Sequence, residues 1–298
     1  MDASATAAAG APAMKPVKKQ NQLASVMKRL SLNKSAMAGM VIFFIVLFFA
    51  LFGELLAPYS YVEINPANAF VPPSAEHWFG TDNMGRDVLS RVLVGCKWSL
   101  FIGVGAQIIA CGGGIVLGCI PGFFGGKVDQ VVMRVCDVIQ AIPSVLLNIT
   151  LAGVMGPGIF NTILAMGLGG ITGGTRLMRS SIMSVRKKEY LEAASAINCS
   201  NPRIIVKHAL PNAFAPMIVS FTMSIGSGII GASALTYLGL GVQAPNPEWG
   251  ALVTAGRDYI KSAPYLTLIP GFCILIVVLS LNLFGDGLRD ALDPKLKK

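Results

Sequence analysis

The amino-acid sequence predicts an all-α membrane protein with six transmembrane helices. Of its 298 residues, 53% are hydrophobic and only 13% are charged, and the mean hydropathy is +0.64. A soluble domain of this length needs more charge to cover its surface, so the excess apolar surface must face lipid. About 20 apolar residues cross a hydrocarbon core of about 30 Å as a helix. The predicted spans are residues 36–53, 99–124, 138–155, 159–178, 213–238 and 265–284.

The N-terminal segment, residues 1–35, is predicted to be a cytoplasmic tail. Residues 1–20 are rich in Ala and Lys and are expected to be disordered. Four apolar residues at helical spacing then predict a short helix on the inner leaflet of the membrane. These are Leu23, Val26, Met27 and Leu30. The first span is too long for the core of a secretory signal, and no cleavage motif follows it, so we expect an uncleaved anchor.

The orientation of the spans follows from the basic residues, which are retained on the cytoplasmic side. Residues 1–35, 125–137, 175–212 and 285–298 hold 19 of the 24 Lys and Arg residues. Six spans with these segments inside place both termini in the cytoplasm of a cell with an inner membrane. The net charge of +9 is therefore a signal of topology, and no nucleic-acid partner is expected.

This topology divides the chain into four parts. Residues 1–35 form the tail, and residues 36–98 form the first span with a periplasmic segment. Residues 99–284 form a five-helix core that carries a cytoplasmic loop at residues 186–212. Residues 285–298 form a C-terminal cytoplasmic tail.

Small residues recur at four-residue intervals in two spans. The second span carries Gly114, Gly118, Gly122 and Gly126, and the fifth is centred on Gly228. This spacing lets helix backbones approach closely, and such packing drives helix association in lipid. The small residues have two possible roles: they pack helices together inside the chain, or they form a sliding surface or an interface with a partner subunit.

The sequence shows no motif by which this chain could itself supply energy for transport or catalyse a covalent reaction. No predicted span has a charge at its centre, which argues against a proton- or ion-driven pump. There is no GxxxxGK[ST] phosphate-binding motif, and a membrane enzyme would need paired polar groups that the spans lack. The six cysteines form no CxxC pair, and His77 and His208 are predicted on opposite sides of the membrane, so we expect no metal site. Energy has to come from a docked partner.

The loop before the fifth span is predicted to be a helix–turn–helix. Residues 190–197 are expected to be helical, and Asn198 is expected to end them in a left-handed cap. Asn201 is the expected N-cap of a second helix, with Pro202 at its first position, and Pro211 is expected to close it.

The first of these helices has a surface suited to docking. Glu189 and Glu192 lie near the favourable N-terminal end of the helix dipole. Ala193 and Ala194 are expected to form a flat face that enters a groove of another protein.

At these residues the sequence resembles a known family. Glu192-Ala193-Ala194, the cap at Asn198 and Leu210-Pro211 resemble the coupling loop of ABC-importer permeases. Three further stretches, residues 80–91, 237–250 and 285–294, narrow the resemblance to the C-type permease of dipeptide, oligopeptide and nickel importers. It covers roughly residues 20–298. The family usually has Gly where this chain has Asn198, and a larger apolar residue where it has Ala209.

The resemblance implies a type I ABC-importer permease fold and a heteromeric assembly. The implied partners are a homologous second permease, two ATPase subunits that bind ATP-Mg, an extracytoplasmic solute-binding protein and membrane lipid. The chain itself would bind no cofactor and catalyse no reaction. The solute, peptide or nickel, stays open, and a passive channel is the rival of another class. The residues implied in ATPase coupling are Glu189, Glu192, Ala193, Ala194, Asn198, Leu210 and Pro211.

The periplasmic family motif has a simpler interpretation beside a functional one. Its residues are Gly80, Thr81, Asp82, Gly85, Arg86, Asp87 and Arg91. Asp82 with Arg86 and Asp87 with Arg91 are spaced as i,i+4 ion pairs of a short helix, worth about 0.2–0.5 kcal/mol each. We favour a stabilised lead-in to the second span over contact with solute. The later stretch at residues 245–249 is expected to be a rigid turn with an interfacial Trp, or part of a landing surface for the binding protein.

Overall fold

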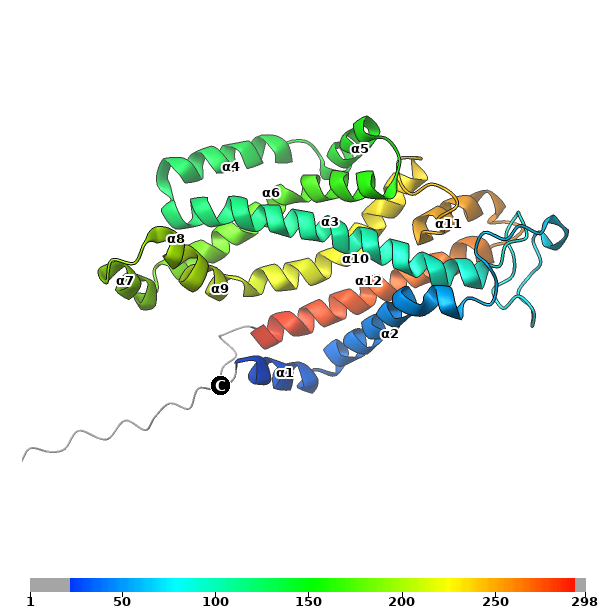
Figure 1. Ribbon diagram of the computed structural model, residues 1–298, viewed down its shortest axis with the longest axis horizontal. Coiled ribbons are helices and arrows are strands. Elements are labelled where there is room, and N and C mark those ends of the chain that lie inside the picture. The colour runs from blue at the N-terminus through cyan, green and yellow to red at the C-terminus, as the bar shows by residue number, and fades with distance from the viewer. Residues whose placement is uncertain (1–21, 293–298) are drawn as a thin grey trace, which may run out of the picture.

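The computed structural model describes residues 22–292, which form a bundle of long helices with no strand among them (Figure 1). The long helices are α2 (Lys34–Leu56), α3 (Val88–Phe124), α6 (Ile159–Arg186), α10 (Ala215–Tyr237) and α12 (Tyr265–Leu292). The shorter ones are α1 (Gln22–Leu32), α4 (Gly126–Gln140), α5 (Ser144–Met155), α7 (Glu189–Ala196), α8 (Asn201–Ile204), α9 (Leu210–Ala213) and α11 (Trp249–Gly256). Three single turns complete the list: η1 (Pro66–Asn68), η2 (Ile205–Ala209) and η3 (Arg257–Tyr259).

The all-α fold is confirmed, and the number of spans remains a prediction. Within residues 22–292, α2, α3, α10 and α12 are long and apolar enough to cross a membrane. The pair α4 and α5 adds a fifth if its two helices are counted as one bent span. The fourth predicted span lies in α6. This helix has 28 residues, but it is not among the helices that are apolar enough to cross a membrane by the same measure. The tail predicted over residues 1–20 and the side chain of Leu23 lie outside what the structure describes.

The third span was predicted as one helix over residues 138–155, and this is wrong. The chain bends by 82° between α4 and α5. Pro143 lacks a backbone N–H and restricts the residue before it, so the helix cannot continue through this point. Most of the predicted inner segment at residues 125–137 is helical and belongs to α4. Ion pairs from Asp129 to Arg179 and from Asp137 to Arg176 hold α4 against α6.

Two other boundaries differ from the prediction. The second span was predicted from residue 99, but α3 begins at Val88, because the carboxylate of Asp87 caps its first turn. The sixth was predicted to end at residue 284, but α12 continues to Leu292, so the predicted tail begins as helix. Hydropathy locates the apolar middle of a helix and misses polar turns that extend it.

Glycines bring α3 and α6 into backbone contact. A Cβ atom added at Gly114 would lie 2.5 Å from the carbonyl carbon of Gly174, and one at Gly118 would lie 2.5 Å from the Thr175 oxygen. Gly122 faces the Arg179 carbonyl in the same way, at 2.9 Å. Internal packing therefore accounts for these three glycines. In α10, Gly228 lies against Gly103 of α3.

Two polar segments lie at opposite ends of the long axis (Figure 1). We call residues 57–91 the polar lead-in and residues 187–214 the helical hairpin. A hydrophobic cluster with Leu100, Trp249 and Leu281 joins α2, α3, α10, α11 and α12 behind the lead-in. A second cluster, with Met178, Ile204 and Met217, joins the hairpin to α3, α6 and α10.

Candidate functional site

The first helix of the hairpin, α7, has one face in the chain and one face outside it. Leu191 is 3% exposed and Ala194 is 7% exposed, and both pack in the cluster around Met178. Ala193 and Glu192 are exposed. The prediction that Ala193 and Ala194 share an outward face is therefore wrong, because neighbouring residues on a helix point about 100° apart. Of the two alanines, only Ala193 is available to another protein.

Asn198 adopts the left-handed conformation predicted for it, with φ of +60°. Its N–H donates to the Ser195 carbonyl at 3.0 Å, and the Cys199 N–H donates to the Ala194 carbonyl at 3.1 Å. These two bonds form a Schellman motif, which satisfies the last carbonyls of α7 and turns the chain sharply. The turn thus brings α8 back toward α6.

The second half of the hairpin differs from the prediction at both ends. Ser200, not Asn201, is the N-cap, because Asn201 is already helical. Pro211 does not close the helix: it lies inside α9, which continues to Ala213. A proline ring clashes with the carbonyl four residues earlier, here that of Lys207. That carbonyl belongs to η2, a π-helical turn whose wider coil accommodates the ring.

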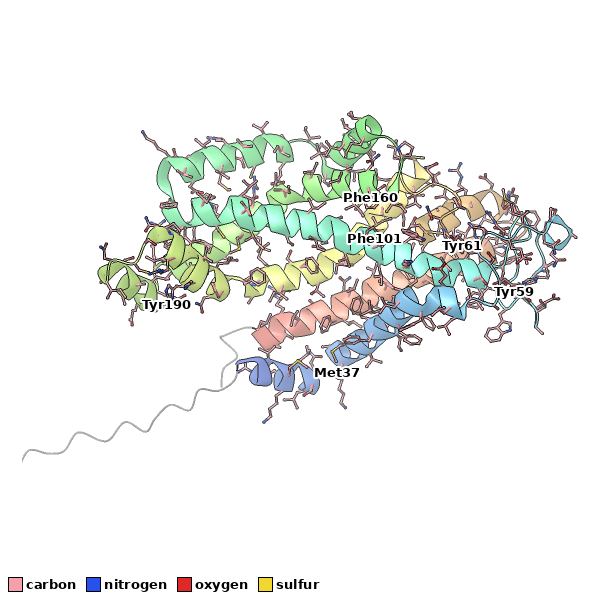
Figure 2. The ribbon with its side chains drawn as sticks, viewed as in Figure 1. Met37, Tyr59, Tyr61, Phe101, Phe160 and Tyr190 are labelled. Carbon is pink, nitrogen blue, oxygen red and sulfur yellow. The ribbon has the colours of Figure 1, made fainter. Side chains whose placement is uncertain are left out.

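The hairpin also frames an open cavity of about 590 Å³ beside α7. Glu192 and Ser195 line it from α7, and Phe123 and Arg186 line it from the ends of α3 and α6. Figure 2 places Tyr190 at this end of the molecule, where its side chain is 41% exposed. Glu189 and Pro211 are exposed, and Leu210 is half-buried against the hairpin cluster. The predicted coupling residues therefore all lie in the hairpin at one end of the molecule, and Glu192 is the one among them that lines the cavity.

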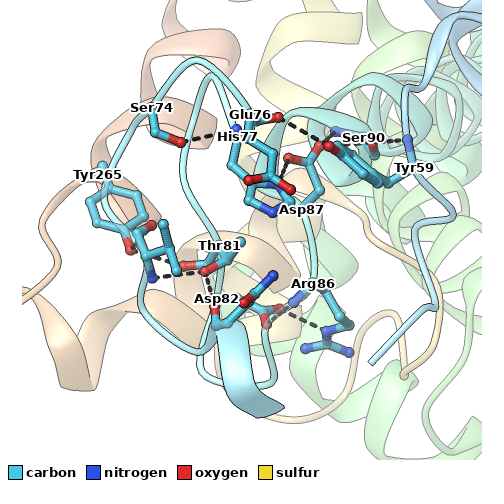
Figure 3. A network of polar contacts seen from close by, with 12 residues as sticks. Tyr59, Ser74, Glu76, His77, Thr81, Asp82, Arg86, Asp87, Ser90 and Tyr265 are labelled. Carbon is cyan, nitrogen blue, oxygen red and sulfur yellow. Dashed lines mark hydrogen bonds and ion pairs between the residues drawn. The ribbon is translucent and has the colours of Figure 1, made fainter. Parts of the chain in front are cut away.

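The polar lead-in is built around two carboxylates (Figure 3). Asp82 accepts from the backbone N–H groups of Met84 and Arg86, at 2.8 and 3.0 Å, and from Arg86 Nε at 2.7 Å. The predicted Asp82–Arg86 pair is present. It closes a turn and does not lie on a helix, so the predicted short helix is wrong.

The predicted pair of Asp87 with Arg91 is also wrong. Asp87 is in an extended conformation and precedes α3, so its carboxylate caps the helix, accepting from the Ser90 N–H and hydroxyl, each at 2.8 Å. Its other oxygen lies 2.9 Å from His77 Nδ1. Arg91 Nη1 instead lies 3.7 Å from an oxygen of Asp82.

The remaining motif residues fold the lead-in on itself, and Thr81 also joins it to α12. Gly80 and Gly85 have φ of +75° and +72°, and a Cβ atom at Gly85 would lie 1.8 Å from the Asn65 carbonyl oxygen. Thr81 accepts from the Val71 N–H at 2.9 Å. The Tyr265 hydroxyl of α12 donates to the Thr81 carbonyl at 2.8 Å. The motif residues are thus largely bonded to one another and to the helix core.

A buried carboxylate that sequence reasoning missed lies nearby. Glu248 is fully buried and caps α11, accepting from the N–H groups of Gly250 and Ala251 at 2.7 and 2.9 Å, and from the Ser99 hydroxyl of α3 at 3.1 Å. Burial raises the pKa of this carboxyl, and the hydrogen bonds oppose that effect. An acidic residue just before an apolar helical run is the signal that could have identified it.

Trp249 corrects a related expectation. It was predicted as an interfacial anchor, but it is 3% exposed, and its indole N–H donates to the Val92 carbonyl of α3 at 2.9 Å. The expected turn at residues 245–249 is thereby attached to α3 from inside the bundle.

Comparison with known proteins matches the chain to two family models and to several relatives. The family model described as binding-protein-dependent transport system inner membrane component matches residues 114–298, and the N-terminal TM domain of oligopeptide transport permease C matches residues 21–73. The dipeptide transport system permease protein DppC of Alkalihalophilus pseudofirmus is 45% identical over 91% of this chain and 89% of its own length. The oligopeptide transport system permease protein OppC of Bacillus subtilis is 38% identical over the same shares. The glutathione transport system permease protein GsiD of Escherichia coli is 39% identical over 96% and 95%.

Solved structures share the fold. A chain of the MetNI methionine ABC transporter, in an inward-facing conformation, superposes with a TM-score of 0.52 at 16% identity, covering 68% of this chain and 93% of that one. A chain of an amino acid ABC transporter crystallised with histidines gives a TM-score of 0.51 at 15% identity, covering 69% and 94%.

Proposed function

We propose, since the chain belongs to the family of binding-protein-dependent transport system inner membrane components, that it forms half of a pathway for di- and oligopeptides in an ABC importer. Support for the solute class comes from relatives that are 38–45% identical over nearly their whole length and are named as dipeptide, oligopeptide or glutathione permeases. Glutathione is itself a short peptide. The proposed partners are a homologous permease, two ATPase subunits and an extracytoplasmic solute-binding protein.

The proposed orientation places the helical hairpin in the cytoplasm and the polar lead-in outside. It rests on the 19 of 24 Lys and Arg residues that lie in the four predicted inner segments. A reporter that is active only in the cytoplasm should work when fused after Lys188 and fail when fused after Pro247. The reverse result would overturn this orientation.

The observation that carries the coupling role is the exposed face of α7 beside its open cavity. Glu189, Glu192 and Ala193 are exposed, while Leu191 and Ala194 anchor the same helix in the cluster with α3 and α6. A force applied to the outer face is therefore passed to these long helices through close contacts. ATP-Mg would bind to the ATPase subunits, and this chain would supply neither cofactor nor catalytic residue.

The test is to replace Ala193 with Trp in the assembled complex. Because the residue is exposed, the chain should fold and insert as before, but the indole should prevent α7 from entering an ATPase groove. We expect ATPase subunits to be lost on purification, or ATP hydrolysis to continue without peptide uptake. Ala67→Trp, at an exposed position at the opposite end of the molecule, is the matched control and should retain the ATPases. Normal uptake by Ala193→Trp in a complex of normal yield would contradict the proposal.

A further inference from the structure

We propose that the break between α4 and α5, with the glycine face of α6 opposite it, is a subsite that binds the main chain of the transported peptide. The inference rests on the proposed function and assigns it a place in the chain. An open cavity of about 370 Å³ lies at this break. The residues lining it include Gln140, Pro143, Ser144, Gly169, Thr172 and Gly173.

The break exposes backbone groups that need a partner. Pro143 is the N-cap of α5 and its side chain cannot accept a hydrogen bond, so no side chain caps this helix. The N–H groups of its first turn, starting at Ser144, have no partner within the helix. Residues 141–146 are all exposed on the chain. In a membrane span such groups are tolerated only where they face protein or a water-filled cavity, so this side of the bent pair faces away from lipid.

The opposite wall contains a glycine that the chain's own packing does not require. A Cβ atom at Gly169 would meet Asn148 Oδ1 at 2.3 Å, and one at Gly174 would meet the Ala110 carbonyl oxygen at 2.7 Å. At Gly173 it would meet nothing within 4 Å. Gly173 therefore leaves the α6 backbone bare where α6 lines the cavity, and a main chain from outside can approach it closely.

The polar groups of the cavity suit a peptide backbone. The Gln140 side-chain amide donates to the Thr172 hydroxyl at 3.1 Å and joins the two walls. None of the lining residues is ionisable. A carboxamide, two hydroxyls and free backbone N–H groups can bond to the amide groups that every peptide shares, whatever its side chains. Neutral walls also avoid selecting peptides by charge.

A helix of the second permease is the other candidate occupant, and it fits less well. A helix satisfies its own backbone groups internally, so it would leave the first N–H groups of α5 without partners. An extended peptide carries free carbonyl groups that can accept from them. We therefore assign the subsite to the solute.

The experiment introduces a side chain where none exists. Gly173→Leu should fill the subsite, and Gly271→Leu is the matched control, because a Cβ atom there also meets nothing within 4 Å and the residue lies in α12. Each variant is assembled with its partners in proteoliposomes, with a radiolabelled tripeptide that the binding protein retains. We expect Gly173→Leu to lower ATP-driven uptake about tenfold or more while complex yield and stimulated ATP hydrolysis stay normal, and Gly271→Leu to transport normally.

A second measurement separates the possible occupants. Gly173→Cys in the complex should react with a charged, membrane-impermeant thiol reagent faster than the unsubstituted chain, whose six cysteines give the background. The transported peptide should slow this additional reaction relative to the same complex without peptide. Failure to react, with a lower yield of Gly173→Leu complex, would assign the face to the partner permease and overturn the proposal. So would normal uptake by Gly173→Leu. If the unsubstituted complex takes up no peptide, the proposed function fails first, and the two failures are thereby distinguished.

Discussion

The polar lead-in and the helical hairpin are stabilised in different ways. In the lead-in, buried ionisable side chains bond to one another and to backbone groups, with Asp87 at 3% exposure and His77 at 6%. In the hairpin, backbone hydrogen bonds of the Schellman motif and small apolar contacts fix the turn, and both glutamates are exposed. The lead-in uses its polar groups internally, whereas the hairpin leaves its charges free for another protein.

The largest expected effect follows from removing the central carboxylate of the lead-in. Asp87→Ala deletes the cap of α3 and leaves His77 and Ser90 without their partner, so we expect a loss of about 3 kcal/mol in the free energy of unfolding. Thermal unfolding of the purified complex in detergent measures it. Asp258→Ala removes an exposed pair with Arg257 and should leave stability nearly unchanged. Equal effects of the two substitutions would contradict this account of the lead-in.

Two adjacent positions in α7 test the same distinction within the hairpin. Ala194→Trp would overfill the cluster around Met178, so it should destabilise the chain by about 1–3 kcal/mol. Ala193→Trp should leave unfolding unchanged and affect only docking. Unfolding curves of both variants, measured without the ATPase subunits, decide the matter. If both variants were equally stable, Ala194 would not be an internal contact.

A third prediction concerns pH at the lead-in end. Burial raises the pKa of Glu248 above its ordinary value of 4.5, so the folded chain binds this proton more tightly than the unfolded chain. The resulting stabilisation is present below pH 4.5 and is lost as the pH rises through the raised pKa. Stability should therefore decline as the pH rises through this window.

The control for this prediction is a pair of glutamine variants. Glu248→Gln cannot ionise and should remove that decline, whereas Glu189→Gln, at an exposed hairpin position, should follow the unsubstituted chain. Melting temperatures across the acidic to neutral range provide the measurement. A decline that persists in Glu248→Gln would assign it to another group.

The smallest effect is expected at the hairpin turn. Asn198 has φ of +60°, which glycine adopts without strain, so Asn198→Gly should be neutral or stabilise by about 0.5 kcal/mol. Asn198→Val should destabilise by about 1–2 kcal/mol, because a β-branched side chain is strongly disfavoured there. ATP-coupled uptake should follow the order Gly about equal to Asn, both well above Val. An inactive Gly variant beside an active Val variant would mean that the Asn side chain makes a specific contact.

The sequence was sufficient for the fold class, the family and the backbone of the hairpin turn. Each depends on local signals. Long apolar runs indicate the fold class, short motifs indicate the family, and Asn198 indicates the left-handed cap of the turn. It was insufficient where a residue's role depends on distant partners. The spacing of Asp87 and Arg91 predicts a helical ion pair, but α3 starts at Val88, so Asp87 is the N-cap and not part of the helix. Trp249 was predicted at the interface because its partner, the Val92 carbonyl, is distant in the sequence. The bend at Pro143 was missed because averaged hydropathy does not detect a single missing N–H.

The π-helical turn at η2 fixes a rotational relation between the two halves of the molecule. A π turn holds more residues than an α turn, and each residue of an α-helix advances the chain by about 100° and about 1.5 Å. Winding the same five residues as a regular α-helix would therefore turn α8 by roughly a quarter of a revolution relative to α10. Ile204 would leave its buried position, and α7 would present a different side outward. The angular alignment of α7 thus depends on the π geometry of this turn as much as on the residues of α7.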